Sequence, residues 1–326
     1  QQRLLGQGRE ALLQVVGPAY RRLAVAMEEL GSKAPPGDGV WKHPRGDEFY
    51  EERLRYFTTT DLGAEEIHAI GLREVERIHG EMRDIMRRIN YEGSLQGFFA
   101  FMREDPRFYY PSDEAGRARY LKEAAQHINA MRARLPEQFG VLPQAELVVK
   151  RVEPFRERSA GKAFYRTPPP DGSRPGIYYA NLSDMGSMPV YQMEALAYHE
   201  GIPGHHMQRA ISVELTTIPE FQKYASFTAF TEGWALYSEQ LAKEMGFYTD
   251  PYSDFGRLAM ELWRACRLVV DTGLHHFRWS RERSIGYLVE NTPNAVYDAE
   301  KAIERYAVMP GQATAYIIGK LKILEL

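Results

Sequence analysis

The sequence predicts a mainly helical protein with one small β-sheet. Apolar residues recur at helical spacing over most of the 326 residues, and 44% of the chain is hydrophobic. The residue pattern changes at 147–182, where β-branched and aromatic residues occur in short runs. No run of 18 apolar residues is present, so we expect no membrane span. This length and composition suit one or two globular domains.

Helical patterns fill the chain before residue 147. An amphipathic stretch covers Leu4–Leu30 and is expected to break near Pro18, because proline disrupts a helix interior. A connector rich in proline and glycine, Gly31–Gly46, follows it. Two further helices are predicted after polar start signals, one ending at about Arg88 and one running from Asp113 to about Arg134.

Three short segments predict a small antiparallel sheet. They are Leu147–Val149, Ala163–Tyr165 and Gly176–Leu182. The sequence P-P-P-D-G-S-R-P-G between the last two is a strong turn signal. Helical patterns resume at about Val190 and continue, with breaks, to the end.

Charge and cysteine content exclude several classes of function. The net charge is -3, so no global basic field favours nucleic acid as a partner. The single cysteine, Cys266, excludes a disulfide within the chain and a thiolate zinc site. A buried, unreactive thiol is expected in its apolar surroundings.

The stretch Y-H-E-G-I-P-G-H-H-M-Q, Tyr198–Gln208, begins like the zinc-binding motif H-E-x-x-H. In that motif two histidines four residues apart share one helix face, so both can reach a zinc ion at about 2.0–2.1 Å. The glutamate beside the first histidine can take a proton from bound water. Here His199 and Glu200 supply the first half, but Pro203 occupies the place of the second histidine.

The proline and its flanking glycines predict that the helix kinks or loops out after Glu200. If the Pro-Gly pair acts as a two-residue insertion, His205 takes the place of the missing ligand. If the helix stayed regular, His206 would share a face with His199 but lie about 10.5 Å along the axis, too far for one zinc ion. We therefore expect His205 to be the ligand, with His206 as the alternative.

A later helix, F-T-E-G-W-A-L-Y-S-E, supplies a candidate third ligand. Glu232 lies in an otherwise apolar setting, and a buried carboxylate is costly unless it is paired or bound to a metal. Glu239 lies near the same face and could orient a zinc-bound histidine, although an ordinary surface acid is equally compatible. The competing explanation of the whole segment is that its histidines are surface or core residues without a ligand role.

The chain resembles the bacterial domain-of-unknown-function family 885 (DUF885). The resemblance rests on H-E-G-I-P-G-H-H-M-Q, F-T-E-G-W-A-L-Y-S-E, V-V-D-T-G-L-H-H-F-R-W-S-R-E and P-G-Q-A-T-A-Y-I-I-G. Two earlier stretches, T-T-T-D-L-G-A-E-E-I-H-A-I-G-L and G-I-Y-Y-A-N-L, fit as well. The resemblance covers nearly the whole chain. Because family members are usually longer, the chain resembles their C-terminal portion.

The family is grouped with zinc peptidases of the gluzincin type. The resemblance therefore implies a helical metallopeptidase-like architecture, with zinc held by His199, His205 and Glu232. It implies Glu200 as the general base, and the family form H-E-x-x-P-G-H favours His205 over its neighbour. Members often carry export or lipoprotein signals, which implies the cell envelope or periplasm.

Amide hydrolysis passes through a tetrahedral oxyanion, which a positioned donor can stabilise. His275 is a candidate because the family motif D-x-G-x-H ends there, whereas His276 is expected to face solvent. Tyr316 is a candidate because it resembles the late tyrosine that related peptidases aim at the site; a packed helix tyrosine is the alternative. Arg267, on the helix leading into His275, could grip a substrate carboxylate or form a structural salt bridge.

Gly176–Leu182, which includes Tyr179 and Asn181, is the predicted edge strand. Its backbone could pair with an extended peptide substrate, or the strand could simply cover the core. We expect residues 1–146 to form an N-terminal helical region and residues 147–326 to form a catalytic zinc-binding region. The two are expected to belong to one continuous unit.

The expected function is a zinc metallopeptidase that hydrolyses peptide bonds, of the carboxypeptidase or oligopeptidase kind. The expected cofactor is Zn2+, and the expected partner is a peptide or small amide. Two alternatives fit the same residues: a zinc hydrolase of a non-peptide amide or ester, and a catalytically inactive peptide-binding homologue.

Overall fold

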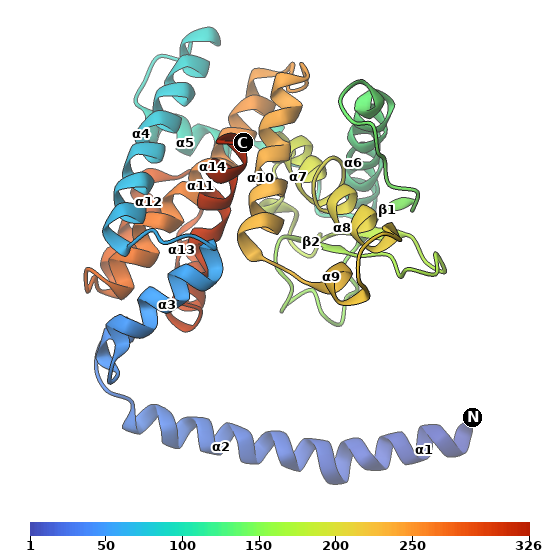
Figure 1. Ribbon diagram of the computed structural model, residues 1–326, viewed down its shortest axis with the longest axis vertical. Coiled ribbons are helices and arrows are strands. Elements are labelled where there is room, and N and C mark those ends of the chain that lie inside the picture. Colours follow the sequence, from blue (N-terminus) through green and yellow to red (C-terminus); the bar gives the residue numbers. More distant parts are fainter. The chain divides into compact units, whose positions relative to one another are not determined.

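The computed structural model describes residues 1–326, which divide into two compact units. The first unit contains the helices α1 (Gln2–Ala11) and α2 (Gly17–Lys33), and the second contains the other helices and all strands of Figure 1. The units are residues 1–37 with 42–44, and residues 38–41 with 45–326. None of the helices combines the length and the apolarity needed to cross a membrane. The functional division at residue 147 stays a prediction.

The first unit does not break near Pro18. A π-helical segment, Leu12–Val16, joins α1 to α2, and the amide of Gly17 donates to the carbonyl of Leu12. Pro18 lies in the first turn of α2, where its missing N–H and fixed φ are tolerated. The π-helical segment before Pro18 thus lets α1 and α2 continue into one another without a break.

The second unit is built around α11 (Pro251–His275), which is buried along most of its length. Its partner on one side is α4 (Ala64–Arg88), and the two helices form the largest helix pair of the fold. A second core cluster lies between α6 (Glu114–Arg134), α7 (Met193–Glu200) and the sheet. The other helices are α3 (Gly46–Thr58), α5 (Leu95–Glu104), α8 (His205–Glu214), α9 (Glu220–Tyr224), α10 (Thr228–Glu244), α12 (Arg281–Asn291), α13 (Val296–Val308) and α14 (Ala315–Leu324).

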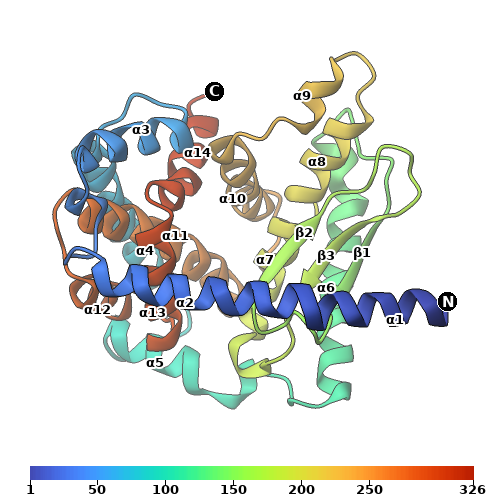
Figure 2. The same cartoon turned by 90° about the horizontal axis from the view of Figure 1, so that it is seen from below.

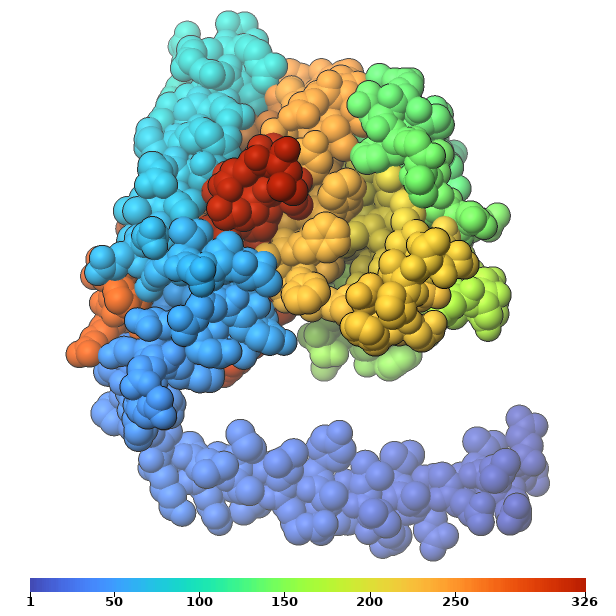
Figure 3. Space-filling model, in the orientation of Figure 1, coloured from blue at the N-terminus to red at the C-terminus, as the bar shows by residue number.

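The helices α10 and α14 pack backbone against backbone. A Cβ atom at Gly233 would lie 2.4 Å from the carbonyl carbon of Gly319, and one at Gly319 would lie 1.9 Å from the carbonyl oxygen of Ala229. Only glycine permits this approach. Figure 3 shows the outer end of α14 in red, seated beside the orange surface of α10. This contact sets the distance between the side chains that the two helices carry.

The sheet has three strands and is mixed rather than antiparallel, which corrects the prediction. β3 (Gly176–Ala180) lies between β1 (Leu147–Arg151) and β2 (Ala163–Arg166), as Figure 2 shows. β2 and β3 are antiparallel, because the predicted proline- and glycine-rich turn joins them as a hairpin. β1 is parallel to β3 and lies on the side of β3 opposite β2.

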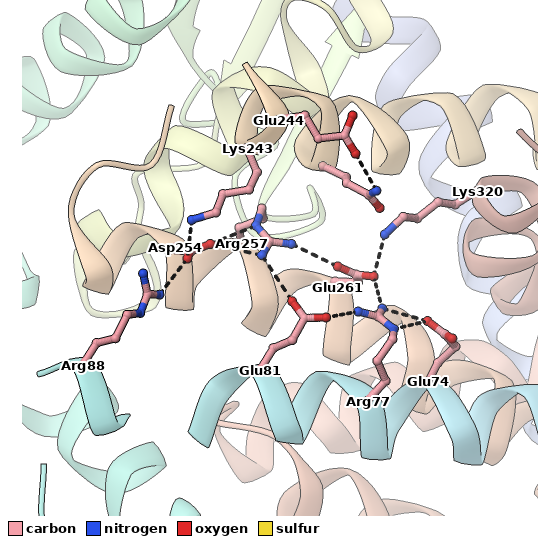
Figure 4. A network of polar contacts seen from close by, with 11 residues as sticks. Glu74, Arg77, Glu81, Arg88, Lys243, Glu244, Asp254, Arg257, Glu261 and Lys320 are labelled. Atoms are coloured by element: carbon pink, nitrogen blue, oxygen red, sulfur yellow. Dashed lines mark hydrogen bonds and ion pairs between the residues drawn. The ribbon is translucent and has the colours of Figure 1, made fainter. Parts of the chain in front are cut away.

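A network of charged side chains, buried at its centre, ties α4, α10, α11 and α14 together (Figure 4). At its centre Glu261 accepts hydrogen bonds from Lys320 at 2.6 Å, from Arg77 at 2.5 Å and from Arg257 at 3.3 Å. Asp254 pairs with Arg257 and with Lys243 of α10. The interior of the second unit is therefore held by charge pairs as well as by apolar packing.

Candidate metal centre

The helix that carries the H-E pair ends at Glu200. The chain then turns through residues 201–204 and starts α8 at His205, so the predicted interruption after Glu200 is present. The amide of Gly204 donates to the carbonyl of Tyr198 at 3.0 Å. A Cβ atom at Gly204 would lie 2.1 Å from the carbonyl oxygen of His199, so this tight turn requires glycine.

The turn is anchored from α10. The indole Nε1 of Trp234 donates to the carbonyl of Pro203 at 2.7 Å. Trp234 lies two residues after Glu232 on the same helix. One hydrogen bond therefore fixes the turn that places His205 relative to the helix that carries Glu232.

Three side chains meet as a candidate metal-binding cluster: His199, His205 and Glu232. Glu232 Oε2 lies 3.7 Å from His199 Nε2 and 3.5 Å from His205 Nε2, and the two imidazole centroids are 4.8 Å apart. Tetrahedral zinc with bonds of about 2.0–2.1 Å places its ligand atoms about 3.3 Å apart. The cluster thus fits a zinc ion with small side-chain adjustments, and a fourth position remains for water or substrate.

Glu239 contacts His199 through Nδ1, the ring nitrogen that does not face Glu232. Its Oε1 lies 2.7 Å from His199 Nδ1, and the carboxylate is buried. This excludes a surface acid at position 239. The contact leaves Nε2 of His199 free to face Glu232, the arrangement in which a carboxylate orients a metal-binding imidazole. Burial lowers the pKa of His199, but hydrogen bonds to Glu232 and Glu239 outweigh it and raise the pKa to about 9.

His206 lies outside the cluster. Its Nδ1 is 2.9 Å from the hydroxyl of Tyr165 in β2, and its Nε2 is 3.0 Å from the carbonyl of Ala145. Burial lowers the pKa of His206 to about 4, so the ring is neutral at pH 7. Both ring nitrogens are committed to structural contacts, and His206 therefore joins α8 to the sheet.

Glu200 lies beside the cluster and is buried. Its Oε2 makes no hydrogen bond, although the atom is shielded from solvent. Burial raises the pKa of Glu200 above the usual range for a glutamate. A buried carboxylate with one free oxygen can accept a proton from a water molecule at the neighbouring ligand cluster.

A cavity of about 500 Å³ opens in front of this cluster. His199, Glu200, His205 and Glu232 all line it. One wall is formed by residues 161–165 of β2 and the segment before it, so the edge strand beside the cluster is β2.

Arg267 and Tyr316 also line the cavity, and their predicted roles stay predictions. The Arg267 guanidinium carbon lies 4.7 Å from the ring centroid of Tyr316, and no acid pairs with this arginine. Burial and the Glu232 carboxylate raise the pKa of Tyr316, so its hydroxyl keeps its proton and can donate.

His275 lies elsewhere. It is buried at the end of α11, where its Nδ1 accepts from the amide of Val40 at 3.2 Å and its Nε2 donates to the carbonyl of Tyr306 at 3.0 Å. With both nitrogens bound to backbone, His275 does not reach the cavity. The neighbouring His276 is exposed, as expected.

The D-T-G-L-H segment instead supports the chain before α14. Asp271 Oδ1 accepts from the hydroxyl of Tyr50 at 2.7 Å and from the amide of Gly311 at 3.0 Å. Gly311 opens the turn that leads into Tyr316. Asp271 and His275 therefore hold Gly311 and the end of α13, which precede α14, and they affect the site only through the position of this segment.

Tyr179 and Asn181 are not in the cavity either. The hydroxyl of Tyr179 donates to Glu153, and the amide of Asn181 donates to the carbonyls of Glu157 and Ala160. Both residues belong to the central strand β3 or its end, which is buried. The prediction of β3 as the edge strand was wrong, because β1 and β2 cover both of its edges.

Sequence reasoning missed several cavity residues. Arg264 lies one helical turn before Arg267 on α11, and Lys162 lies just before β2. The spacing of the two arginines was visible as an i, i+3 pair. Lys162 could not be placed, because its position depends on which strand forms the sheet edge.

Fold and cluster together define a mainly helical protein with a candidate His-His-Glu metal centre. The chain belongs to the family of bacterial proteins of unknown function called DUF885, whose profile matches residues 1–326. No curated protein matches the chain.

Two solved structures are similar to the chain. A protein of Colwellia psychrerythraea described as a "putative lipoprotein" has 41% sequence identity and a TM-score of 0.97. The match covers 99% of this chain and 56% of the Colwellia chain. A Shewanella oneidensis protein, described as a "putative lipoprotein of unknown function", has 17% identity and a TM-score of 0.73. The match covers 94% of this chain and 56% of the Shewanella chain. The second likeness concerns the fold alone. The chain thus spans about half the length of both relatives.

Proposed function

We propose that the protein is a zinc metallopeptidase of the gluzincin type. The observation that carries the proposal is the meeting of His199, His205 and Glu232 beside the free oxygen of Glu200, at the wall of a cavity of about 500 Å³. Two imidazoles and one carboxylate with an open fourth position form the ligand set of a catalytic rather than a structural zinc site.

Each side chain then has a defined task. When bound, zinc supplies a Lewis acid that acidifies water and polarises a carbonyl. His199 and His205 offer their Nε2 atoms, and Glu239 keeps the first ring in place. Glu200 accepts a proton at its free Oε2 and returns it to the leaving amine. Tyr316 donates its hydroxyl proton towards the oxyanion.

A peptide substrate is supported by the sheet edge. β2 lies at the edge of the sheet, and its residues 163–165 line the cavity. An edge strand offers free backbone N–H and C=O groups, to which an extended peptide can add as a further strand. We accordingly move the proposed pairing role from β3 to β2.

We also propose a location in the cell envelope. The support is the description of the Colwellia psychrerythraea relative as a "putative lipoprotein", at 41% identity.

The Glu200→Gln substitution tests the catalytic proposal. It keeps the shape of the side chain but removes the base, so peptide cleavage by the zinc-loaded protein should fall by about 10²–10⁴-fold while zinc content stays unchanged. Mass spectrometry of a peptide mixture incubated with each variant measures the loss. Glu290→Gln, at an exposed position on α12, is the matched control and should cleave like the unmodified chain. Undiminished cleavage by Glu200→Gln would contradict the assignment.

A further inference from the structure

The cavity holds an excess of positive charge. Five cationic side chains line it, and the only carboxylates that line it are Glu200 and Glu232, which belong to the proposed zinc site. None of the five cations forms an ion pair with an acid of the chain. They are Lys162, Arg209, Arg264, Arg267 and Arg305.

Two of these cations are built into the wall. Arg264 and Arg267 lie one turn apart on α11 and flank the same ring, with guanidinium carbons 6.0 and 4.7 Å from the Tyr316 centroid. The Nε atom of each is shielded from solvent and has no hydrogen-bond partner. Arg264 donates one bond, from Nη1 to the carbonyl of Met260 at 2.9 Å. Neither guanidinium group is paired with an acid, and both line the cavity, so both can donate to a ligand there.

The same helix pairs its one buried arginine, Arg257, with acids, whereas Arg264 and Arg267 are half-buried. Arg257, two turns earlier, is held by Asp254 at 3.1 Å and by Glu261 at 3.3 Å. Burying a charged group without a partner is costly. On this one helix, therefore, Arg257 has acidic partners within the fold, whereas Arg264 and Arg267 have none and are available to a ligand.

Lys162 faces this pair from the sheet side. The residue is exposed overall, but its ammonium group donates to Gln192 inside the cavity. Both Lys162 and Gln192 line the cavity with Arg264 and Arg267. Cationic donors thus come from α11 and from the segment that leads into the edge strand.

We propose that Arg264 and Arg267, assisted by Lys162, bind the free C-terminal carboxylate of a short peptide. This inference rests on the proposed peptidase function and makes the protein an exopeptidase acting at C-terminal ends. A guanidinium group matches a carboxylate in geometry and binds it through two parallel N–H donors. The location of the pair in the cavity that holds the zinc ligands places the substrate end within the same site.

Matched peptides test the proposal without relying on turnover. The probes are Gly-Ala-Gly-Ala-Phe as the free acid, the same peptide as the C-terminal amide, and the amide with Asp in place of Phe. Binding to the zinc-loaded Glu200→Gln protein is measured by calorimetry. We expect the free acid to bind at least tenfold more tightly than either amide, because a hydrogen-bonded charge pair is worth roughly ten- to a hundredfold in affinity.

Arginine variants in the same background locate the effect. Arg264→Gln and Arg267→Gln should each reduce the affinity for the free acid about tenfold or more and leave the amide unchanged. Arg73→Gln, at an exposed position on α4, is the matched control and should keep the full preference. The acid-to-amide comparison on the parent protein needs no arginine variant, so it decides the proposal even if one variant fails to fold.

Three results would overturn the inference. Equal affinity for the free acid and the amide would rule out a subsite for the C-terminal carboxylate. Affinity for the Asp amide equal to that for the free acid would show that the arginines bind acidic side chains instead. Competition by inorganic phosphate at concentrations that match the free acid would assign the arginines to phosphate. The proposed peptidase function fails separately, if the unmodified zinc-loaded protein binds the free acid but cleaves none of the peptides.

Discussion

At the scale of single residues, the site depends on how His199 is held. Its Nδ1 contacts Glu239, which fixes the ring so that Nε2 points at the cluster. His205 has to be placed by the turn after Glu200, because the two candidate histidine ligands are on different helices. The sequence named all three candidate ligands: the two histidines from motif spacing, and Glu232 from its apolar setting and the family resemblance.

The Glu239→Gln substitution tests the supporting contact. The amide keeps the volume of the side chain but loses its charge, so zinc should bind about 10–100-fold more weakly. Competition with a chromogenic chelator measures the dissociation constant. Glu244→Gln, exposed on the same helix, is the control and should bind zinc as the parent does. Unchanged affinity in Glu239→Gln would show that His199 orients itself without help.

The role expected for His275 depended on information that the sequence does not carry. A histidine in a polar segment after an apolar helix looks available for catalysis. In the fold, the backbone of Val40 and Tyr306 reaches it from distant parts of the chain and uses both nitrogens. Such long-range partners cannot be inferred from spacing.

At the scale of elements, the contact between α10 and α14 sets the site geometry. Glu232 and Tyr316 are carried by these two helices, and Gly233 and Gly319 let the backbones meet. The sequence indicates both helices through their apolar spacing. It does not indicate that the glycines face each other, because this depends on the relative rotation of two helices far apart in the chain.

The Gly319→Ala substitution tests this contact. The added methyl group would meet the carbonyl oxygen of Ala229, so the helices must separate. We expect a loss of about 1–3 kcal/mol in the free energy of unfolding, measured by urea denaturation. Gly286→Ala, in the middle of α12 with no atom within 4 Å, is the control and should be neutral or slightly stabilising. A stable Gly319→Ala protein would refute the close approach.

The sheet illustrates what local patterns determine and what they do not. All three strands lie where β-branched and aromatic residues predicted them. The turn at Pro168–Gly176 indicated the β2–β3 hairpin correctly. Strand order was not predictable, because the insertion of β3 between β1 and β2 follows from how the connection after Arg151 crosses the sheet. The error placed the proposed substrate-pairing edge on β3, which is the central strand.

At the scale of the whole molecule, the charged network around Glu261 joins four helices of the second unit. Burial raises the pKa of Glu261, but Lys320, Arg77 and Arg257 outweigh it and lower the pKa to about 2. The folded pKa therefore lies below the usual value of 4.5. Stabilisation by this group is complete above pH 4.5 and is lost as the pH falls towards 2.

The Glu261→Gln substitution should destabilise the fold strongly. It removes the charge that three cations share and leaves the buried Lys320 without an acidic partner, and breaking a buried pair typically costs about 3–5 kcal/mol. Urea denaturation at pH 7 measures the loss, and repeating it down to pH 3 should show a smaller acid dependence than in the parent. Glu92→Gln, at an exposed position, is the control. Equal stability and equal acid dependence would rule out a central role for Glu261.

The most direct test of the account is the metal content of the purified chain. Elemental analysis compares the parent with His205→Ala, Glu232→Ala and two histidine controls, His206→Ala and the exposed His276→Ala. We predict about one zinc per chain in the parent and both controls, and almost none in the two ligand variants. A parent protein that remains metal-free after incubation with zinc, or full zinc retention by His205→Ala, would contradict the proposed centre.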